Sequence, residues 1–214
     1  MIEPSLTAVQ VLGQRPVYRV RDLFGPAGSR ATAYRLLRKL QELGFASETR
    51  KRGHFVLRSS VFQPYSLWPH LLPSLRALKE ARYFGRAYDG SDVNHARRLL
   101  MGSVTLDYRA YELTRFQTPR TFFIYVEDPE GQAKMLRLAG FSEGRKGRVA
   151  ILPRADGDFE HEIQRLYLDC LAFGGRSTLD AIAIELLYGD ELSIRGVFPT
   201  DLVIKVREDL PRES

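Results

Sequence analysis

The clearest periodic pattern of apolar positions lies in residues 29–58. Five apolar residues recur there at intervals of three and four, which predicts a helix from Arg30 to Leu43 with one buried face. They are Ala33, Leu36, Leu37, Leu40 and Leu43. Ser29 is placed to cap this helix and Gly44 to end it. Phe45–Thr49 and His54–Arg58 then predict two short strands, joined by the turn Arg50-Lys51-Arg52-Gly53.

The residues before this helix add shorter elements. Ser5–Leu12 has helical spacing, Val17–Val20 is an apolar lead-in with strand character, and Val20–Phe24 predicts a brief helix. Gly25-Pro26-Ala27-Gly28 predicts a tight turn. Helix, short helix, turn, long helix and hairpin follow one another as in a winged helix-turn-helix. We therefore expect an N-terminal winged helix-turn-helix domain over residues 1–62.

Residues 63–76 contain three prolines and Trp68. The prolines predict that no continuous helix crosses this segment, and the aromatic residues predict an ordered connector packed against its neighbours. For Trp68, burial is favoured over stacking on nucleic acid.

Residues 77–214 alternate between helical and strand patterns. Helices are expected over 75–83, 92–101, 132–139, 159–172, 177–188 and from 198 to 206, and strands over 121–126 and 148–152. Ser177 is expected as an N-cap, with Asp180 in the capping-box position. The fold class predicted for the whole chain is α+β, with a mixed α/β second domain.

Charge is distributed unevenly along the 214 residues. Residues 1–62 hold eleven Lys/Arg and four Asp/Glu, a balance of +7, whereas the whole chain carries +6. The other residues therefore have a balance of −1. A basic module joined to a neutral one is typical of a nucleic-acid-binding domain with a second function attached.

The polar face of the long helix and the turn of the hairpin together form the candidate site for double-stranded DNA. Its residues are Ser29, Arg30, Thr32, Tyr34, Arg35, Arg38, Lys39, Arg50, Lys51, Arg52 and His54. Arg30, Thr32 and Arg35 are expected at base edges, and Arg38 and Lys39 nearer the backbone. The three turn cations are expected at phosphates or in the minor groove. A merely solvated basic face is the alternative, and Tyr34 is equally compatible with the core.

Other chemistry has weaker support in the sequence. The four histidines are scattered, and His161-Glu162 lacks the second histidine of a zinc protease helix. Asp156, Asp158 and Glu160 fit an exposed acidic turn better than an ion site, and Cys170 fits a buried, inert thiol. We therefore assign no metal, cofactor or catalytic residue. Because no membrane span or secretion signal is evident, the expected location is the cytoplasm.

One further pattern is similar to the opening of a nucleotidyltransferase fold. Met101-Gly102-Ser103 precedes a helical stretch, DYRAYEL, and the strand TFFIYVED. Two-metal phosphoryl transfer needs carboxylates that converge on the ions, but Glu127 and Asp128 are adjacent and point to opposite faces of a strand. The pattern therefore predicts a nucleotidyltransferase-like domain without catalytic acids.

Taken with SRATAYRLLRKLQELGF and GGRSTLDAIAIELLYG, this arrangement resembles the antitoxins of AbiE-type abortive-infection systems. The resemblance implies a transcriptional regulator that represses its own operon through the winged helix and counters a protein toxin through the second domain. It carries over Ser29, Thr32, Tyr34, Arg35 and the turn cations as DNA contacts. A homodimer, a nucleotidyltransferase-like enzyme acting on nucleotides or nucleic acid, and a protein-binding winged helix stay open as alternatives.

Overall fold

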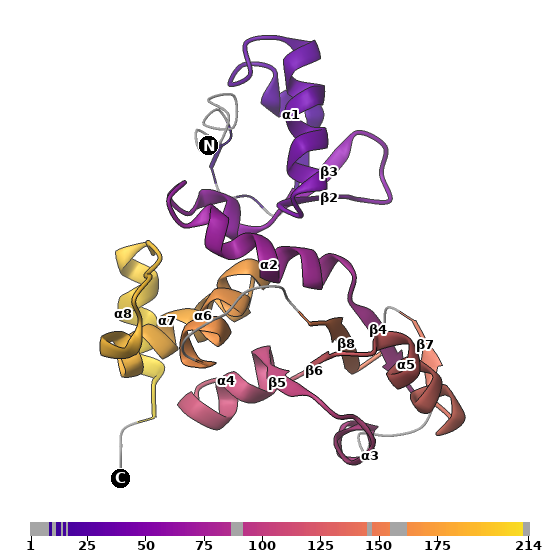
Figure 1. Ribbon diagram of the computed structural model, residues 1–214. Coiled ribbons are helices and arrows are strands. Elements are labelled where there is room, and N and C mark those ends of the chain that lie inside the picture. Colours follow the sequence, from indigo (N-terminus) through magenta and orange to yellow (C-terminus); the bar gives the residue numbers. More distant parts are fainter. Residues whose placement is uncertain are drawn as a thin grey trace.

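The protein is an α+β molecule with two sheets, shown by a computed structural model in Figure 1. The structure describes residues 17–86, 92–144, 147–154 and 162–211, with Val9, Leu12, Gly13 and Arg15 ahead of them. Eight α-helices lie within these ranges, and none of them is long and apolar enough to cross a membrane.

The N-terminal part is a three-stranded antiparallel sheet with one long helix. The elements are β1 (Tyr18–Arg19), the 3-10 helix η2 (Val20–Leu23), α1 (Arg30–Glu42), β2 (Ala46–Glu48) and β3 (His54–Leu57), in the sheet order β1-β3-β2. The predicted long helix and hairpin are confirmed. The Ser29 Oγ accepts a hydrogen bond from the Thr32 amide at 3.1 Å, and Gly44 has a φ of +84°. The helix expected over residues 5–12 lies largely outside the described residues.

Helix α2 (Trp68–Lys79) contradicts the prediction for the proline-containing connector. Pro69 lies in the first turn, where an amide has no partner within the helix, but Pro73 lies inside the helix. The helix persists because Trp68, Leu71 and Leu75 are all buried, so packing outweighs the loss of a hydrogen bond at Pro73. The prediction of a helix that continues to residue 83 is also wrong, because α2 ends at Lys79 and a strand, Arg82–Gly85, follows.

The second sheet has five strands in the order β5-β6-β8-β4-β7. They are β4 (Arg82–Gly85), β5 (Ser103–Thr105), β6 (Phe122–Val126), β7 (Ser142–Glu143) and β8 (Val149–Pro153). Only β6 and β8 are parallel neighbours among these strands. All five residues of β6 are buried, which fits a strand that is covered on both faces.

Helices cover both faces of this sheet. Phe122 and Ile124 of β6 pack with α3 (Asp92–Leu99) and α5 (Pro129–Leu138). Phe123 and Tyr125 belong to the larger core, which includes α2, α4 (Leu106–Thr114) and α6 (Glu162–Phe173).

The C-terminal elements are α7 (Ser177–Tyr188), the 3-10 helix η4 (Gly189–Glu191) and α8 (Thr200–Asp209). The N-cap predicted for α7 is wrong by one residue. Arg176 is the N-cap and has no side-chain capping bond, while the Asp180 Oδ1 accepts a hydrogen bond from Gln117 at 2.8 Å. The capping box is therefore absent, because this carboxylate is used to join α7 to the segment after α4.

The N-terminal part is joined to the rest by packing and by buried polar contacts. The Phe45 and Trp68 rings lie 4.2 Å apart, so one apolar core runs through the junction. Arg58 donates to the Gly44 carbonyl at 3.1 Å and to the Phe173 carbonyl at 2.9 Å. Burial lowers the pKa of Arg58.

A glycine permits close approach at the same junction. Gly174 has a φ of +74°, and a Cβ placed there would lie 2.5 Å from the Ser59 Oγ. The chain between α6 and α7 can therefore pass this close to Ser59, the first residue of the 3-10 helix η3 (Ser59–Phe62), because no side chain is present at Gly174.

Candidate nucleic-acid interface

Helix α1 presents its polar side to solvent, as the apolar spacing predicted. Ala33, Leu36, Leu37 and Leu40 are buried. Six of the predicted contact residues on this helix and its cap are exposed, and Thr32 is half-buried. The exposed six are Ser29, Arg30, Tyr34, Arg35, Arg38 and Lys39. Tyr34 is 49% exposed and so lies at the surface, beside the ring of Phe24 at 6.4 Å.

Hydrogen bonds order the N-terminal half of this surface. The Ser29 Oγ donates to the Thr32 Oγ1 at 2.9 Å, and Arg35 donates to the same oxygen at 3.3 Å. The Arg30 guanidinium lies 5.8 Å from the centre of the Tyr34 ring. These contacts limit the side-chain motion of Arg30 and Arg35 near the start of α1. In recognition helices, the residues that read bases lie near this end.

The turn between β2 and β3 carries the second group of predicted residues. Arg50, Lys51 and Arg52 are exposed, and Gly53 has a φ of +72°. The Lys51 amide donates to the Thr49 Oγ1 at 3.2 Å, which helps to fix the turn. His54 is half-buried, and its Nδ1 lies 3.1 Å from the Arg52 carbonyl oxygen, so this histidine supports the turn from within.

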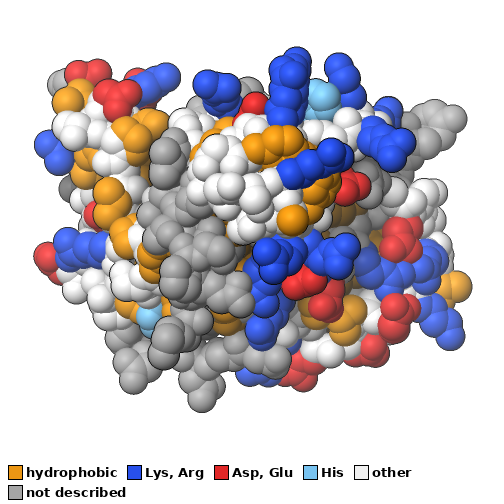
Figure 2. Space-filling model, turned by 90° about the horizontal axis from the view of Figure 1, so that it is seen from above, with side chains coloured by type: hydrophobic (Ala, Val, Ile, Leu, Met, Phe, Trp, Pro, Cys, Tyr) orange, Lys and Arg blue, Asp and Glu red, His pale blue; other side chains and the backbone are white. Residues whose placement is uncertain are grey.

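The cations of this part have no carboxylate partners among the described residues. All ion pairs in the described ranges lie between residues 82 and 195. Figure 2 looks onto the end of the molecule that holds the N-terminal part, and Lys and Arg side chains project along its upper edge. We call the seven side chains on α1 and its neighbouring turn the basic face: Arg30, Arg35, Arg38, Lys39, Arg50, Lys51 and Arg52.

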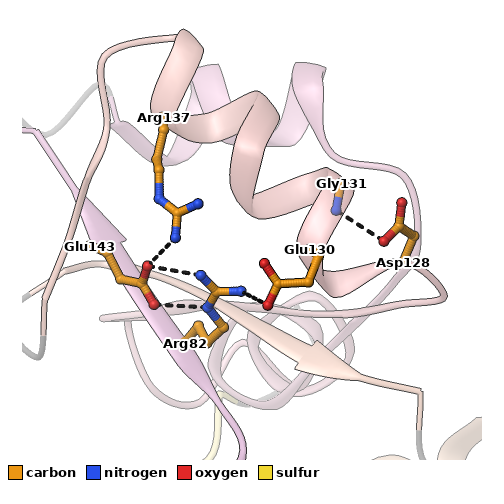
Figure 3. A network of polar contacts seen from close by, with 6 residues as sticks. All are labelled: Arg82, Asp128, Glu130, Gly131, Arg137 and Glu143. Carbon is orange, nitrogen blue, oxygen red and sulfur yellow. Dashed lines mark hydrogen bonds and ion pairs between the residues drawn. The ribbon is translucent and has the colours of Figure 1, made fainter.

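In the second part of the molecule, which contains the five-stranded sheet and its helices, several arginines form ion pairs with glutamates. Arg82 lies between Glu130 and Glu143, at 2.6 Å and 2.8 Å, and Arg137 reaches Glu143 at 2.6 Å (Figure 3). These two guanidinium groups lower the pKa of Glu143 to about 2. The arginines here join α5, β4 and β7, whereas the cations of the basic face form no ion pair with any described carboxylate.

Sequence reasoning missed three residues at this interface. Arg19, Arg21 and Phe24 line a hollow of about 480 Å³ together with residues of α1 and the turn. The alternation of apolar and basic residues from Tyr18 to Arg21 was the available signal, since it predicts that both arginines point outward.

A second hollow, of about 470 Å³, lies at the end of β6. Gly102, Ser103, Glu127 and Asp128 all line it, so the start of β5 and the end of β6 lie side by side here. A Cβ on Gly102 would lie 1.9 Å from the Tyr125 carbonyl oxygen, which explains why glycine is needed there.

The two carboxylates of this hollow have structural partners. Glu127 pairs with Arg154, and the Asp128 Oδ1 accepts from the Gly131 amide at 2.9 Å to cap α5 (Figure 3). No group of three or more potential metal ligands is found among the described residues. The acidic turn Asp156, Asp158 and Glu160 lies outside them.

The interior behind this hollow is polar but closed. The Asp169 carboxylate accepts hydrogen bonds from Ser74 and Thr105, both at 2.6 Å, and from Tyr125 at 2.9 Å. Burial raises the pKa of Asp169 and of its neighbour Cys170. Cys170 is fully buried, as expected, and its thiol therefore stays protonated.

Comparison of the chain with protein-family models, with curated proteins and with solved structures finds no match.

Proposed function

We propose that this protein is a sequence-specific, double-stranded DNA-binding transcriptional regulator. The observation that carries the proposal is the basic face, whose seven cations all lack carboxylate partners among the described residues, whereas several arginines of the second part, such as Arg82, Arg109 and Arg137, form ion pairs. Uncompensated, clustered cations attract the phosphates of a duplex. The element order and the β1-β3-β2 sheet support a winged helix-turn-helix, with α1 as the recognition helix.

The two ends of α1 contact different parts of the duplex. Arg30, Thr32 and Arg35 near its start read base edges in the major groove, and the arginines suit guanine O6 and N7. Arg38 and Lys39, further along the helix, contact phosphates. The turn cations at residues 50–52 contact the backbone beside the groove.

The test is a binding titration on duplexes selected from a random pool, repeated at several salt concentrations. Replacing Arg50, Lys51 and Arg52 together by Gln removes about three phosphate contacts. The slope of log affinity against log salt should then fall by about 0.9 for each contact. The matched control replaces Arg98, Arg120 and Lys134 by Gln, since these are exposed and form no ion pair with described residues.

The control should bind as the unaltered protein does. Equal affinity and equal slope for the turn variant would refute the proposal, as would a failure of the unaltered protein to protect any selected duplex in dilute buffer. The selected sequences also report symmetry, because two half-sites in inverted order indicate a homodimer.

The resemblance to AbiE-type antitoxins adds a protein toxin as a proposed second partner. Its support is the sequence pattern that led to the resemblance, so its test is separate from DNA binding. Co-expression with the product of a neighbouring gene, followed by growth measurement and co-purification, should show rescue of growth and a stable complex. Growth inhibition that this protein does not relieve would refute the antitoxin role and leave the DNA-binding proposal standing.

A further inference from the structure

The charged residues that line the hollow beside α1 are all basic. Six side chains matter for its chemistry: Arg19, Arg21, Phe24, Tyr34, Lys51 and His54. Three are cations, two are aromatic, and no carboxylate lines the hollow. The one acidic residue between Arg19 and Phe24 is Asp22, which does not line the hollow. Its Oδ2 accepts a hydrogen bond from the Arg19 amide at 2.8 Å.

Three separate segments bring these cations together. Arg19 lies directly opposite His54 where β1 and β3 run side by side as antiparallel strands. The Val20 amide donates a hydrogen bond to the Gly53 carbonyl at 3.0 Å. The start of η2 is thereby fixed against the turn that carries Lys51. The cations therefore meet in a place set by backbone hydrogen bonds, and binding an anion there does not require the backbone to be ordered first.

The aromatic residues give the hollow an apolar wall. The Phe24 and Tyr34 rings are 6.4 Å apart, and Tyr34 is also a neighbour of the Arg30 guanidinium. An occupant that suits this lining has a phosphate for the arginines and the lysine and a ring whose C–H groups can pack against the aromatic wall. A phosphate with its deoxyribose has both.

We infer that this hollow holds one backbone phosphate, with its sugar, of the duplex bound by α1. Arg19, Arg21 and Lys51 bind the phosphate, and Tyr34 and Phe24 contact the sugar. The inference rests on the proposed function and adds a second anchor, between η2 and the turn, on the flank of the recognition helix. Such an anchor sets how deeply and at what angle α1 enters the groove.

The experiment combines protein variants with chemically altered DNA. Arg19→Gln and Arg21→Gln are made singly and together, and each is titrated with the selected duplex at several salt concentrations. Because Arg19 and Arg21 share one phosphate with Lys51, the double variant should lower the salt slope by at most about 0.9, the value for one phosphate contact. Arg15→Gln is the matched control, because Arg15 is exposed in the same part of the chain but does not line the hollow.

A series of duplexes, each with one neutral methylphosphonate, then locates the phosphate. With the unaltered protein, one position should weaken binding through the loss of its charge. With the double variant, the penalty at the same position should shrink to the part that Lys51 supplies, while penalties at the other contacted positions remain unchanged. This non-additivity is the signature of direct contact.

Two results would overturn the inference. The first is that the penalties of the double variant and of every methylphosphonate add, which places the arginines away from any single phosphate. Alternatively, inorganic phosphate or 5′-dTMP raises the melting temperature through Arg19 and Arg21 while both variants bind duplex normally, which makes the hollow a site for a small anion. Normal duplex binding by the variants overturns this inference alone, whereas no duplex binding by the unaltered protein overturns the proposed function as well.

Discussion

Asp180 provides a quantitative test of the packing between α4 and α7. Its side chain is only 4% exposed, and its Oδ1 accepts a hydrogen bond from Gln117 at 2.8 Å. Gln117 in turn accepts from the Arg176 guanidinium at 2.6 Å. Burial raises the pKa of Asp180 from 3.8 to about 7, the Gln117 hydrogen bond opposes this, and the charge of Asp107 adds to it.

The sign of the stability effect follows from this pKa. Between pH 4 and pH 7 the folded protein keeps a proton on Asp180 that the unfolded chain has lost, so the free energy of unfolding falls as the pH rises. The stabilisation that comes from the proton on Asp180 is fully present below the pKa of this carboxyl in the unfolded chain. It is lost as the pH rises through the pKa of about 7 in the folded protein. A shift of about three pKa units, each worth about 1.4 kcal/mol, amounts to about 4 kcal/mol.

Asp180→Asn should therefore stabilise the protein at high pH. Asparagine imitates the protonated carboxyl and keeps an oxygen for Gln117, but it never becomes charged. The variant should match the unaltered protein at pH 4 and exceed its free energy of unfolding by up to about 4 kcal/mol at pH 8. Because both proteins keep Asp169, the comparison isolates Asp180.

Urea unfolding is the assay, followed by the fluorescence of Trp68, the one tryptophan of the chain, which is 1% exposed. A reducing agent keeps Cys170 as a thiol after unfolding. Asp190→Asn, on an exposed side chain, is the control and should change little at either pH. A variant of Asp180 that is less stable at pH 8, or that keeps the full pH dependence, would show that this carboxyl is charged in the folded protein.

Three further predictions concern the interface and the junction. Arg35→Ala should cost about 1–3 kcal/mol on a selected duplex and relax the preference at one base pair, measured by repeating the selection; an unchanged preference would remove Arg35 from the base-reading residues. Gly174→Ala should lower the melting temperature, since a Cβ would meet the Ser59 Oγ at 2.5 Å on a backbone with positive φ, and equal melting would contradict this close approach. Trp68→Phe keeps an aromatic ring but loses the indole hydrogen bond to the Gln63 carbonyl at 3.0 Å, so urea unfolding followed by circular dichroism should show a loss of about 1 kcal/mol.

The elements that the sequence predicted well are those specified by neighbouring residues. In α1 the cap at Ser29, the apolar spacing and the stop at Gly44 all act within one helix, so a local reading was sufficient. The exposure of its cations followed from the same spacing. Strand β6 was equally clear, because five successive β-branched or aromatic residues indicate a strand buried on both faces.

The errors occurred where distant residues decide the structure. Packing retains α2 through Pro73, and pairing with β8 makes a strand of Arg82–Gly85, whose two aromatic residues are too short a pattern to predict a strand. The hollow beside α1 was missed for the same reason, because the pairing of Arg19 with His54 creates it. No local pattern specifies contacts between residues so far apart in the chain.

The shared core at Phe45 and Trp68 has a consequence for how the chain assembles during synthesis. Residues 17–62 emerge from the ribosome before α2 and α6, but their core continues into both of these helices. The carbonyl of Phe173, which accepts from Arg58, follows 115 residues later. The nascent N-terminal part is therefore left with an apolar surface open to water until the C-terminal helices are translated, and a chain halted before α6 is a natural target for chaperones.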